Sequence, residues 1–211
     1  MKSYDHKHLA EYLSQTILET HSYLQTRLFI HGCVFPDHNP IGYLQGLLAG
    51  HPMKIHFIIY SKPKLQRLLE KLESRDALSL WGYYQLGVLT HYLADAFTYP
   101  HNETFTGNML AHEKYERQDL HTALINALSE PGNASLPENN LHKDADLWYT
   151  FCSLHKTYEQ TAPAPQTDVQ YIVPICERAC REFICRQPSD TMSARVRFVN
   201  AWSGIYRRNM S

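Results

Sequence analysis

The chain has 211 residues, a formal net charge of −1 and a hydrophobic content of 44%. This length suits one globular domain, and the small net charge creates no overall field that would draw the protein to nucleic acid or to an anionic membrane. The apolar runs are shorter than the roughly 18 residues of a membrane-spanning helix, and the N-terminal residues lack the apolar core of a secretory signal. The five cysteines are odd in number and lack CxxC spacing, so we expect reduced thiols in a cytoplasmic protein.

Apolar residues at helical spacing predict helices along most of the chain. In chain order, the expected helices cover residues 9–30, 41–50, 54–74, 77–97, 108–130, 144–160, 168–187 and 193–209. Residues 30–40 contain Gly32 and Pro36 and are expected to form a loop, and Asp76 is expected to cap the helix that follows it. The sequence has no internal repeat and no alternating strand pattern. We therefore expect one all-α domain over residues 1–211, folded as a multi-helix bundle.

Two pairs of candidate metal ligands stand at helical i, i+4 spacing. His91 and Asp95 lie in the most apolar expected helix, and His112 and Glu116 lie in the next one. Residues four apart share one face of a helix, so each pair can bind a single ion. Taken alone, the first pair is more readily explained as a hydrogen-bonded pair in a core, and the second as part of a solvated helix face.

Further candidate ligands flank these two pairs. His101 follows a Tyr-Pro turn between the two helices, Asp37 lies in a Pro-Asp loop, His51 follows a glycine, and His6 lies near the N-terminus. Carboxylate oxygen and neutral imidazole nitrogen are ligands that zinc takes in catalytic sites. His56 remains an alternative to His51.

The order H…PD…GH…HxxxD…H…HxxxE resembles that of the zinc-dependent phospholipase C family, whose relatives include fungal single-strand nucleases. Six residues separate Asp95 from His101, and fourteen separate Asp37 from His51, as in that family. The stretch FIHGCVFPDHNPIGYLQGLLAGH is similar to the corresponding segment of bacterial cytosolic members. The resemblance covers residues 6 to 116, and the remaining C-terminal part of the chain offers no matching ligand.

The resemblance implies an all-α bundle of the phospholipase C and nuclease type, with a cleft for two to three zinc ions built mainly from residues 1–120. The implied ligands are Asp37, His51, His91 and Asp95 for the first zinc, His101, His112 and Glu116 for the second, and His6 with a bridging Asp95 and the amine of Met1 for the third. Secreted relatives expose a Trp N-terminus, whereas Met1 stands at that place here. Without the Met1 amine, we expect the third site to be weak or empty.

The implied reaction is hydrolysis of a phosphodiester by a hydroxide that the zinc ions activate, with Asp95 shared between ions and Asp37 assisting the water as a base. The expected substrate is a phosphodiester, with phospholipids among the candidates; a nuclease is an alternative that the net charge does not favour. A different class of function is a catalytically silent zinc-binding protein, or a helical interaction protein, of the same fold. An HD-type phosphohydrolase is disfavoured because the chain has no adjacent His-Asp pair. The sequence does not indicate an oligomeric state.

Overall fold

The computed structural model describes residues 1–19, 21–39, 58–75, 77–130 and 145–185. Within these residues every regular element is helical and no strand occurs, so the all-α prediction is confirmed. The elements are α1 (Ser3–Thr16), α2 (Tyr23–His38), α4 (Ile58–Glu73), α5 (Leu80–Ala96), the 3-10 turn η1 (Tyr99–His101), α6 (Met109–Lys114), the π-helical segment η2 (Tyr115–Leu120), α7 (His121–Ser129), α8 (Leu147–Tyr158) and α9 (Pro165–Cys185). No described helix has the length and apolar character needed to cross a membrane.

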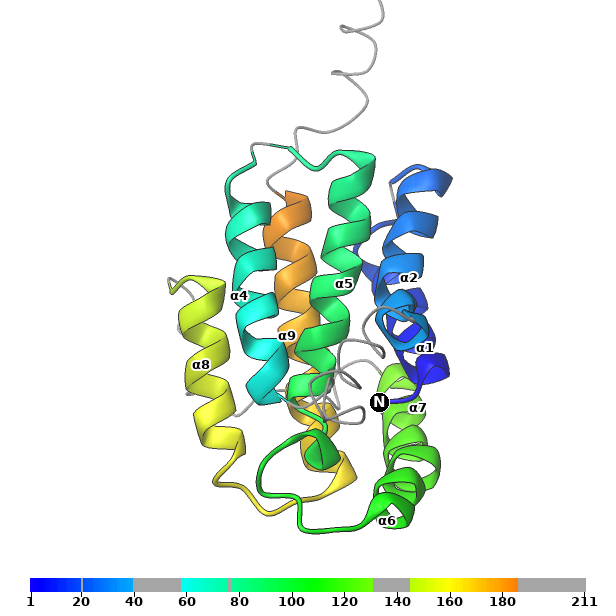
Figure 1. Ribbon diagram of the computed structural model, residues 1–211. Helices are drawn as coiled ribbons and strands as arrows, with labels where there is room; N and C mark the ends of the chain where they lie inside the picture. The colour runs from blue at the N-terminus through cyan, green and yellow to red at the C-terminus, as the bar shows by residue number, and fades with distance from the viewer. Residues whose placement is uncertain (20, 40–57, 76, 131–144, 186–211) are drawn as a thin grey trace, which may run out of the picture.

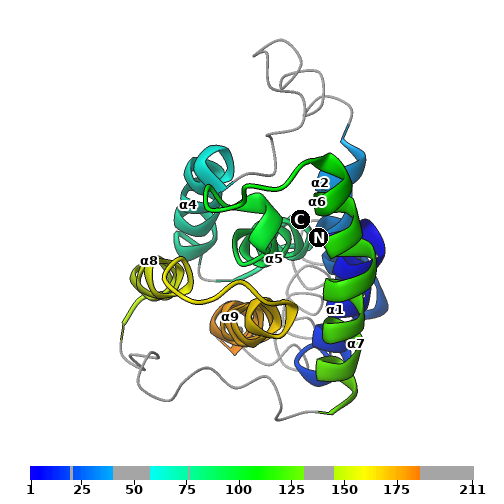
Figure 2. The ribbon, with the colours of Figure 1, turned by 90° about the horizontal axis from the view of Figure 1, so that it is seen from below.

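Helix α5 is the centre of the bundle. Figure 2 shows it surrounded by α4, α9 and α2, with α8 beyond α4 and α9 and with α1 and α7 on the opposite side. Its apolar residues Leu86, Leu89 and Leu93 are completely buried. Full burial of a leucine side chain stabilises a fold by about 1.5–3 kcal/mol. An apolar helix buried on all sides is what the sequence predicts for this segment.

Helices α2 and α5 pack against each other at two glycines. A Cβ atom added to Gly32 would lie 2.1 Å from the Tyr84 carbonyl oxygen, and one added to Gly87 would lie 2.1 Å from the Phe29 carbonyl oxygen. Only residues without side chains permit backbones to come this close. The close approach also lets the Cys33 carbonyl contact a side chain of α5, as described below.

The first two helices differ from the sequence prediction. The helix expected over 9–30 is wrong as a single element, because α1 ends at Thr16 and α2 starts at Tyr23. Ser22 caps α2 through a reciprocal capping box, in which its hydroxyl accepts from the Gln25 N–H and its own N–H donates to the Gln25 side chain.

The prediction of a loop over residues 30–40 is also wrong. Helix α2 continues to His38 and contains Pro36 in its last turns. Phe29, Gly32 and Cys33 are buried on the same helix. This buried face outweighs the breaker composition of the segment, including the one intrahelical hydrogen bond that Pro36 cannot donate.

The helix expected over 108–130 is present, but it is divided into α6, η2 and α7. Asn108 caps it by accepting from the Ala111 N–H. At the start of α5, Ser79 performs this function by accepting from the Gly82 N–H. Asp76, the expected cap, and the helices expected over 41–50 and 193–209 lie outside the described residues.

Candidate metal centre

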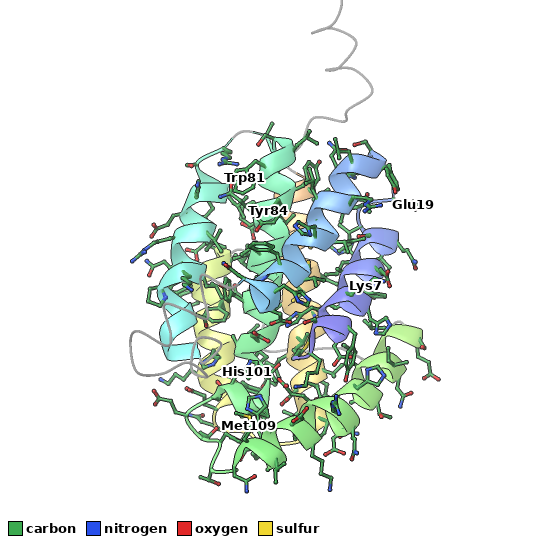
Figure 3. All side chains as sticks on the ribbon, turned by 45° about the vertical axis from the view of Figure 1, so that its right-hand side comes forward. Lys7, Glu19, Trp81, Tyr84, His101 and Met109 are labelled. Atoms are coloured by element: carbon green, nitrogen blue, oxygen red, sulfur yellow. The ribbon has the colours of Figure 1, made fainter. Side chains whose placement is uncertain are left out.

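The predicted ligands within the described residues converge at one end of the bundle. His6 comes from α1, Asp37 from the end of α2, and the remaining residues from α5 and the segments that follow it. Figure 1 shows the N-terminus near this lower end of α5, next to α1 and α7. In Figure 3, His101 lies at the same end near Met109, far from Trp81 and Tyr84 at the other end.

Asp95 is at the middle of this cluster and is completely buried. Its Oδ1 lies 2.7 Å from the Met1 amino nitrogen, 3.2 Å from His6 Nε2 and 3.3 Å from His101 Nδ1. Its Oδ2 lies 3.2 Å from His91 Nε2. Burial by itself would raise the pKa of this carboxyl, but the Met1 ammonium and the surrounding histidines hold it well below its usual value. Asp95 is therefore an anion with nitrogen atoms on several sides.

His91 is held by its other ring nitrogen. Its Nδ1 lies 2.9 Å from the Cys33 carbonyl oxygen, a contact that the close packing of α2 on α5 makes available. A donor hydrogen bond from Nδ1 leaves Nε2 as the nitrogen that can bind a metal, and such bonds orient metal-binding histidines in general. The His6 ring stacks on His91 at a centroid distance of 3.9 Å. Burial and the neighbouring His91 lower the pKa of His6 to about 4, so His6 is neutral at pH 7.

A second group consists of His101, His112 and Glu116. Glu116 Oε1 lies 3.0 Å from His101 Nε2, 3.3 Å from His112 Nε2 and 3.0 Å from the Met1 amino nitrogen. This oxygen is buried and lies within 3.3 Å of all three nitrogens. Glu116 lies in the π-helical segment η2, and such segments are frequent at functional sites.

The Met1 amino group is held between carboxylates. Burial would lower its pKa, but Asp95, Glu116 and Asp37 outweigh that effect and raise the pKa to about 11. Lys2 adds a second cation, with its Nζ 3.3 Å from Glu116 Oε2. The buried carboxylates at this end of the bundle therefore stabilise positive charge.

Asp37 lies at the edge of the cluster. Its Oδ1 is 3.7 Å from His91 Nε2, and its Oδ2 accepts a hydrogen bond from the Ser3 hydroxyl at 2.8 Å. Burial opposes ionisation, but His6 and His91 hold the pKa of Asp37 below its usual value.

These residues fit zinc. Within each of two groups, the ligand atoms lie within 4.8 Å of one another; the groups are His6, His91 and Asp95, and His101, His112 and Glu116. The donors are imidazole nitrogens and carboxylate oxygens, which zinc prefers. The buried Glu116 oxygen lies within 3.3 Å of three nitrogens, which are the surroundings expected of a carboxylate that shares a cation with neighbouring ligands.

A model of the family described as zinc-dependent phospholipase C matches residues 5–153, which is more than half of the chain. The chain belongs to the zinc-dependent phospholipase C family. The resemblance read from the ligand order is therefore confirmed. Neither the search of curated proteins nor that of solved structures found a match.

The match to the zinc-dependent phospholipase C family includes every predicted ligand except Met1. The structure brings together Met1, His6, Asp37, His91, Asp95, His101, His112 and Glu116. His51 and its alternative His56 lie outside the described residues. The use of each residue as a ligand stays a prediction.

A cleft of about 470 Å³ opens onto this centre. It is lined by Met1, Lys2, Ser3, Asp37, His101, Met109, His112, Glu113 and Glu116. Met109 and its neighbour Leu110 are exposed large apolar side chains. The cleft therefore has a charged base and an apolar residue at its wall.

Sequence reasoning missed Asp168, which lies beyond the family match on α9. This carboxyl is completely buried. Its Oδ2 accepts from the Tyr99 N–H and the Tyr115 hydroxyl, each at 2.9 Å, and its Oδ1 accepts from the Tyr158 hydroxyl at 2.7 Å. Burial raises the pKa of Asp168 to about 7, against the three hydrogen bonds, which lower it.

The partners of Asp168 connect it to the centre through the backbone. Tyr99 stands two residues before His101, and Tyr115 immediately precedes Glu116. Asp168 therefore fixes both segments that supply the second group. Its partners lie 10, 53 and 69 residues away in the chain, a separation at which no periodic pattern can connect them.

Proposed function

We propose that this protein is a zinc-dependent phosphodiester hydrolase of the phospholipase C type. The observation that carries the proposal is the position of Asp95 between the two ligand groups, within 3.3 Å of nitrogens from His6, His91 and His101. A carboxylate in that position can bridge neighbouring ions, as two-metal hydrolytic sites require. The family assignment adds independent support.

The proposed centre holds two to three zinc ions. His91, Asp37 and Asp95 would bind the first with His51, the second group would bind another, and His6, Asp95 and the Met1 amine would bind a third. Zinc bound in this way lowers the pKa of coordinated water to about 7 and neutralises charge on phosphoryl oxygens.

Asp37 is the residue that we assign to accept a proton from the attacking water. Its side chain is 14% exposed and lines the cleft, whereas those of Asp95 and Glu116 are 0% and 4% exposed. Its low pKa keeps it ionised at neutral pH. The Ser3 hydroxyl orients the carboxylate through its hydrogen bond to Oδ2.

Other residues of the cleft suit a lipid phosphodiester. The Lys2 ammonium lies at the cleft and can attract the phosphoryl anion. Met109 and Leu110, with exposed fractions of 47% and 76%, offer apolar surface where acyl chains would meet the protein. A nucleic-acid substrate would be favoured by a basic surface, whereas the net charge is −1.

The test compares the zinc-loaded wild type with Asp95→Asn and with a matched control, Asp146→Asn. Asp146 is exposed and caps α8 by accepting from the Tyr149 N–H, a function that asparagine preserves. We expect the wild type and the control to hydrolyse bis(p-nitrophenyl) phosphate and phosphatidylcholine vesicles, and Asp95→Asn to lose turnover and the zinc of the proposed centre. Hydrolysis by Asp95→Asn at the wild-type rate would contradict the bridging role.

The same assay distinguishes the alternatives. Cleavage of a single-stranded oligonucleotide in preference to vesicles would identify a nuclease. Bound zinc without turnover of any of these phosphodiesters would identify a catalytically silent member of the family.

A further inference from the structure

A second cluster of potential ligands lies outside the proposed centre, between the first turns of α1 and the start of α7. It consists of Asp5, His8 and His121, whose ligand atoms all lie within 4.8 Å of one another. We propose that these residues bind a further zinc ion, separate from those of the proposed centre.

Asp5 is the anionic part of this cluster and is completely buried. Its Oδ1 lies 2.6 Å from His121 Nδ1. Its Oδ2 is buried without a hydrogen-bond partner, and so is His8 Nδ1. Buried polar atoms in proteins are almost always satisfied, so two such atoms in one cluster require an explanation.

An ordinary hydrogen bond between Asp5 and His121 explains only part of this arrangement. It satisfies one carboxylate oxygen, and it gives His8 no function. A metal ion between the three side chains would bind the carboxylate and both imidazoles at once. The cluster thus has more ligand atoms than a single hydrogen bond needs.

The donor set selects the kind of ion. One carboxylate and two imidazoles form one of the three-residue sets that zinc takes, with water in the fourth position. Bonds of about 2.1 Å in a tetrahedron place ligand atoms about 3.4 Å apart. The 2.6 Å contact between Asp5 and His121 would therefore open slightly as the ion replaces the shared proton. The His121 side chain is 35% exposed, which gives the ion a path from solvent.

The site is distinct from the centre, although it shares helix α1 with it. His6 points to Asp95, whereas its neighbour Asp5 contacts His121 on α7. Adjacent helical residues project about 100° apart, which accounts for the two directions. An ion held here would tie α1 to α7 and so fix Met1 and His6 relative to the segment that carries Glu116.

The test measures zinc per chain in the full-length protein after loading with zinc and dialysis against metal-free buffer. The variants are His8→Ala and His121→Ala, with His31→Ala as the control because His31 is an exposed histidine on α2. We expect each of the first two to hold one zinc fewer than the wild type and His31→Ala. His8→Ala leaves the Asp5–His121 hydrogen bond in place, so it tests the metal without disturbing that contact.

The same variants in an Asp95→Asn background separate this site from the proposed centre. In the Asp95→Asn background we expect the zinc at Asp5, His8 and His121 to remain bound. Adding His8→Ala should remove this zinc, whether or not the protein hydrolyses phosphodiesters. Circular dichroism verifies that each variant is folded. Equal zinc content in the wild type and His8→Ala would overturn the proposal and leave Asp5 and His121 as a buried hydrogen-bonded pair.

Discussion

At the scale of single residues, Glu116 gives the sharpest test of the second ligand group. Its Oε1 has nitrogens of Met1, His101 and His112 within 3.3 Å. Glu116→Gln removes the charge and puts an amide donor among these groups. We expect the loss of one zinc per chain and a fall in phosphodiester turnover on the order of 100-fold or more, because even residues that only orient metal ligands contribute 10–100-fold.

Zinc analysis and steady-state rates on bis(p-nitrophenyl) phosphate measure this effect. Glu11→Gln is the matched control, since the Glu11 side chain is 41% exposed on α1 and its Oε1 lies 3.5 Å from Lys7 Nζ, outside the metal centre. A Glu116→Gln protein with full zinc content and wild-type turnover would remove Glu116 from the metal centre.

The sequence predicts these ligands because their chemistry is local. His91 with Asp95 and His112 with Glu116 are i, i+4 pairs, which any helix brings onto one face. Asp168 could not be predicted in this way, because its tyrosine partners come from separate elements. Asp5 and His121 lie 116 residues apart in the chain, so only the packing of α1 on α7 brings them together.

At the scale of helices, the contact of α2 with α5 determines how His91 is held. We expect Gly87→Ala to destabilise the protein by about 1–3 kcal/mol, because its methyl group would collide with the backbone of α2. Separating the two helices would also lengthen the bond from His91 to the Cys33 carbonyl, so zinc affinity should fall by about 10–100-fold. Urea unfolding and zinc competition with a chelator measure the two effects.

Gly82→Ala is the control on the same helix. Its added methyl group would lie 3.0 Å from Leu78 Cδ2 and 3.2 Å from Leu78 Cβ, which are side-chain atoms and not backbone atoms of a neighbouring helix. Alanine has a higher helix propensity than glycine by about 1 kcal/mol, so this variant should be neutral or more stable. Equal stability of the Gly82→Ala and Gly87→Ala variants would contradict the close helix contact.

Helix α9 acts on the centre through Asp168, and its buried carboxyl predicts a pH dependence. Burial raises the pKa of Asp168 to about 7 from the ordinary value of 3.8, so the folded protein keeps a proton that the unfolded chain has lost. The stability that this group contributes is fully present below pH about 4 and is lost as pH rises through about 7. The free energy of unfolding of the wild type should therefore fall over this interval relative to that of Asp168→Asn, which cannot titrate.

Urea unfolding of both proteins, with zinc present at each pH, gives this difference. Asp146→Asn is the control for the same change of carboxyl to amide at an exposed position. A difference that stays flat between pH 4 and 7 would mean that the hydrogen bonds from Tyr99, Tyr115 and Tyr158 outweigh burial and hold the carboxylate ionised.

The helices themselves are largely predictable, but their ends and irregularities are not. Apolar periodicity located α5 and α8 to within a few residues, because most of their stability comes from one buried face or from complete burial. The π-helical segment η2 has no such signal, since it depends on Tyr115 reaching Asp168 and Glu116 reaching the Met1 amine. The continuation of α2 through Pro36 likewise depends on its packing against α5.

At the scale of the whole molecule, the centre gathers carboxylates of Asp37, Asp95 and Glu116 in a place largely shielded from water. Burying charge is costly unless opposite charge compensates it. In the structure, the Met1 ammonium and Lys2 supply part of this compensation. Divalent cations would supply more, so the stability of the fold and the occupancy of the centre should be linked.

Removal of zinc should therefore lower the melting temperature. A ligand that binds only the folded state stabilises it by about 2.7 kcal/mol at a concentration 100-fold above its dissociation constant. For a chain of this size, each kcal/mol shifts the melting temperature by about 2–4 °C, which predicts a fall of about 5–10 °C after chelation. Differential scanning calorimetry with and without chelator measures the shift, and readdition of zinc should reverse it.

Two variants serve as controls for this effect of zinc on the melting temperature. His8→Ala should keep most of the effect, since it leaves the main centre intact, whereas Asp95→Asn should lose most of it. A melting temperature that does not respond to chelation in a protein shown to release its zinc would mean that the bundle balances its buried carboxylates without the metal.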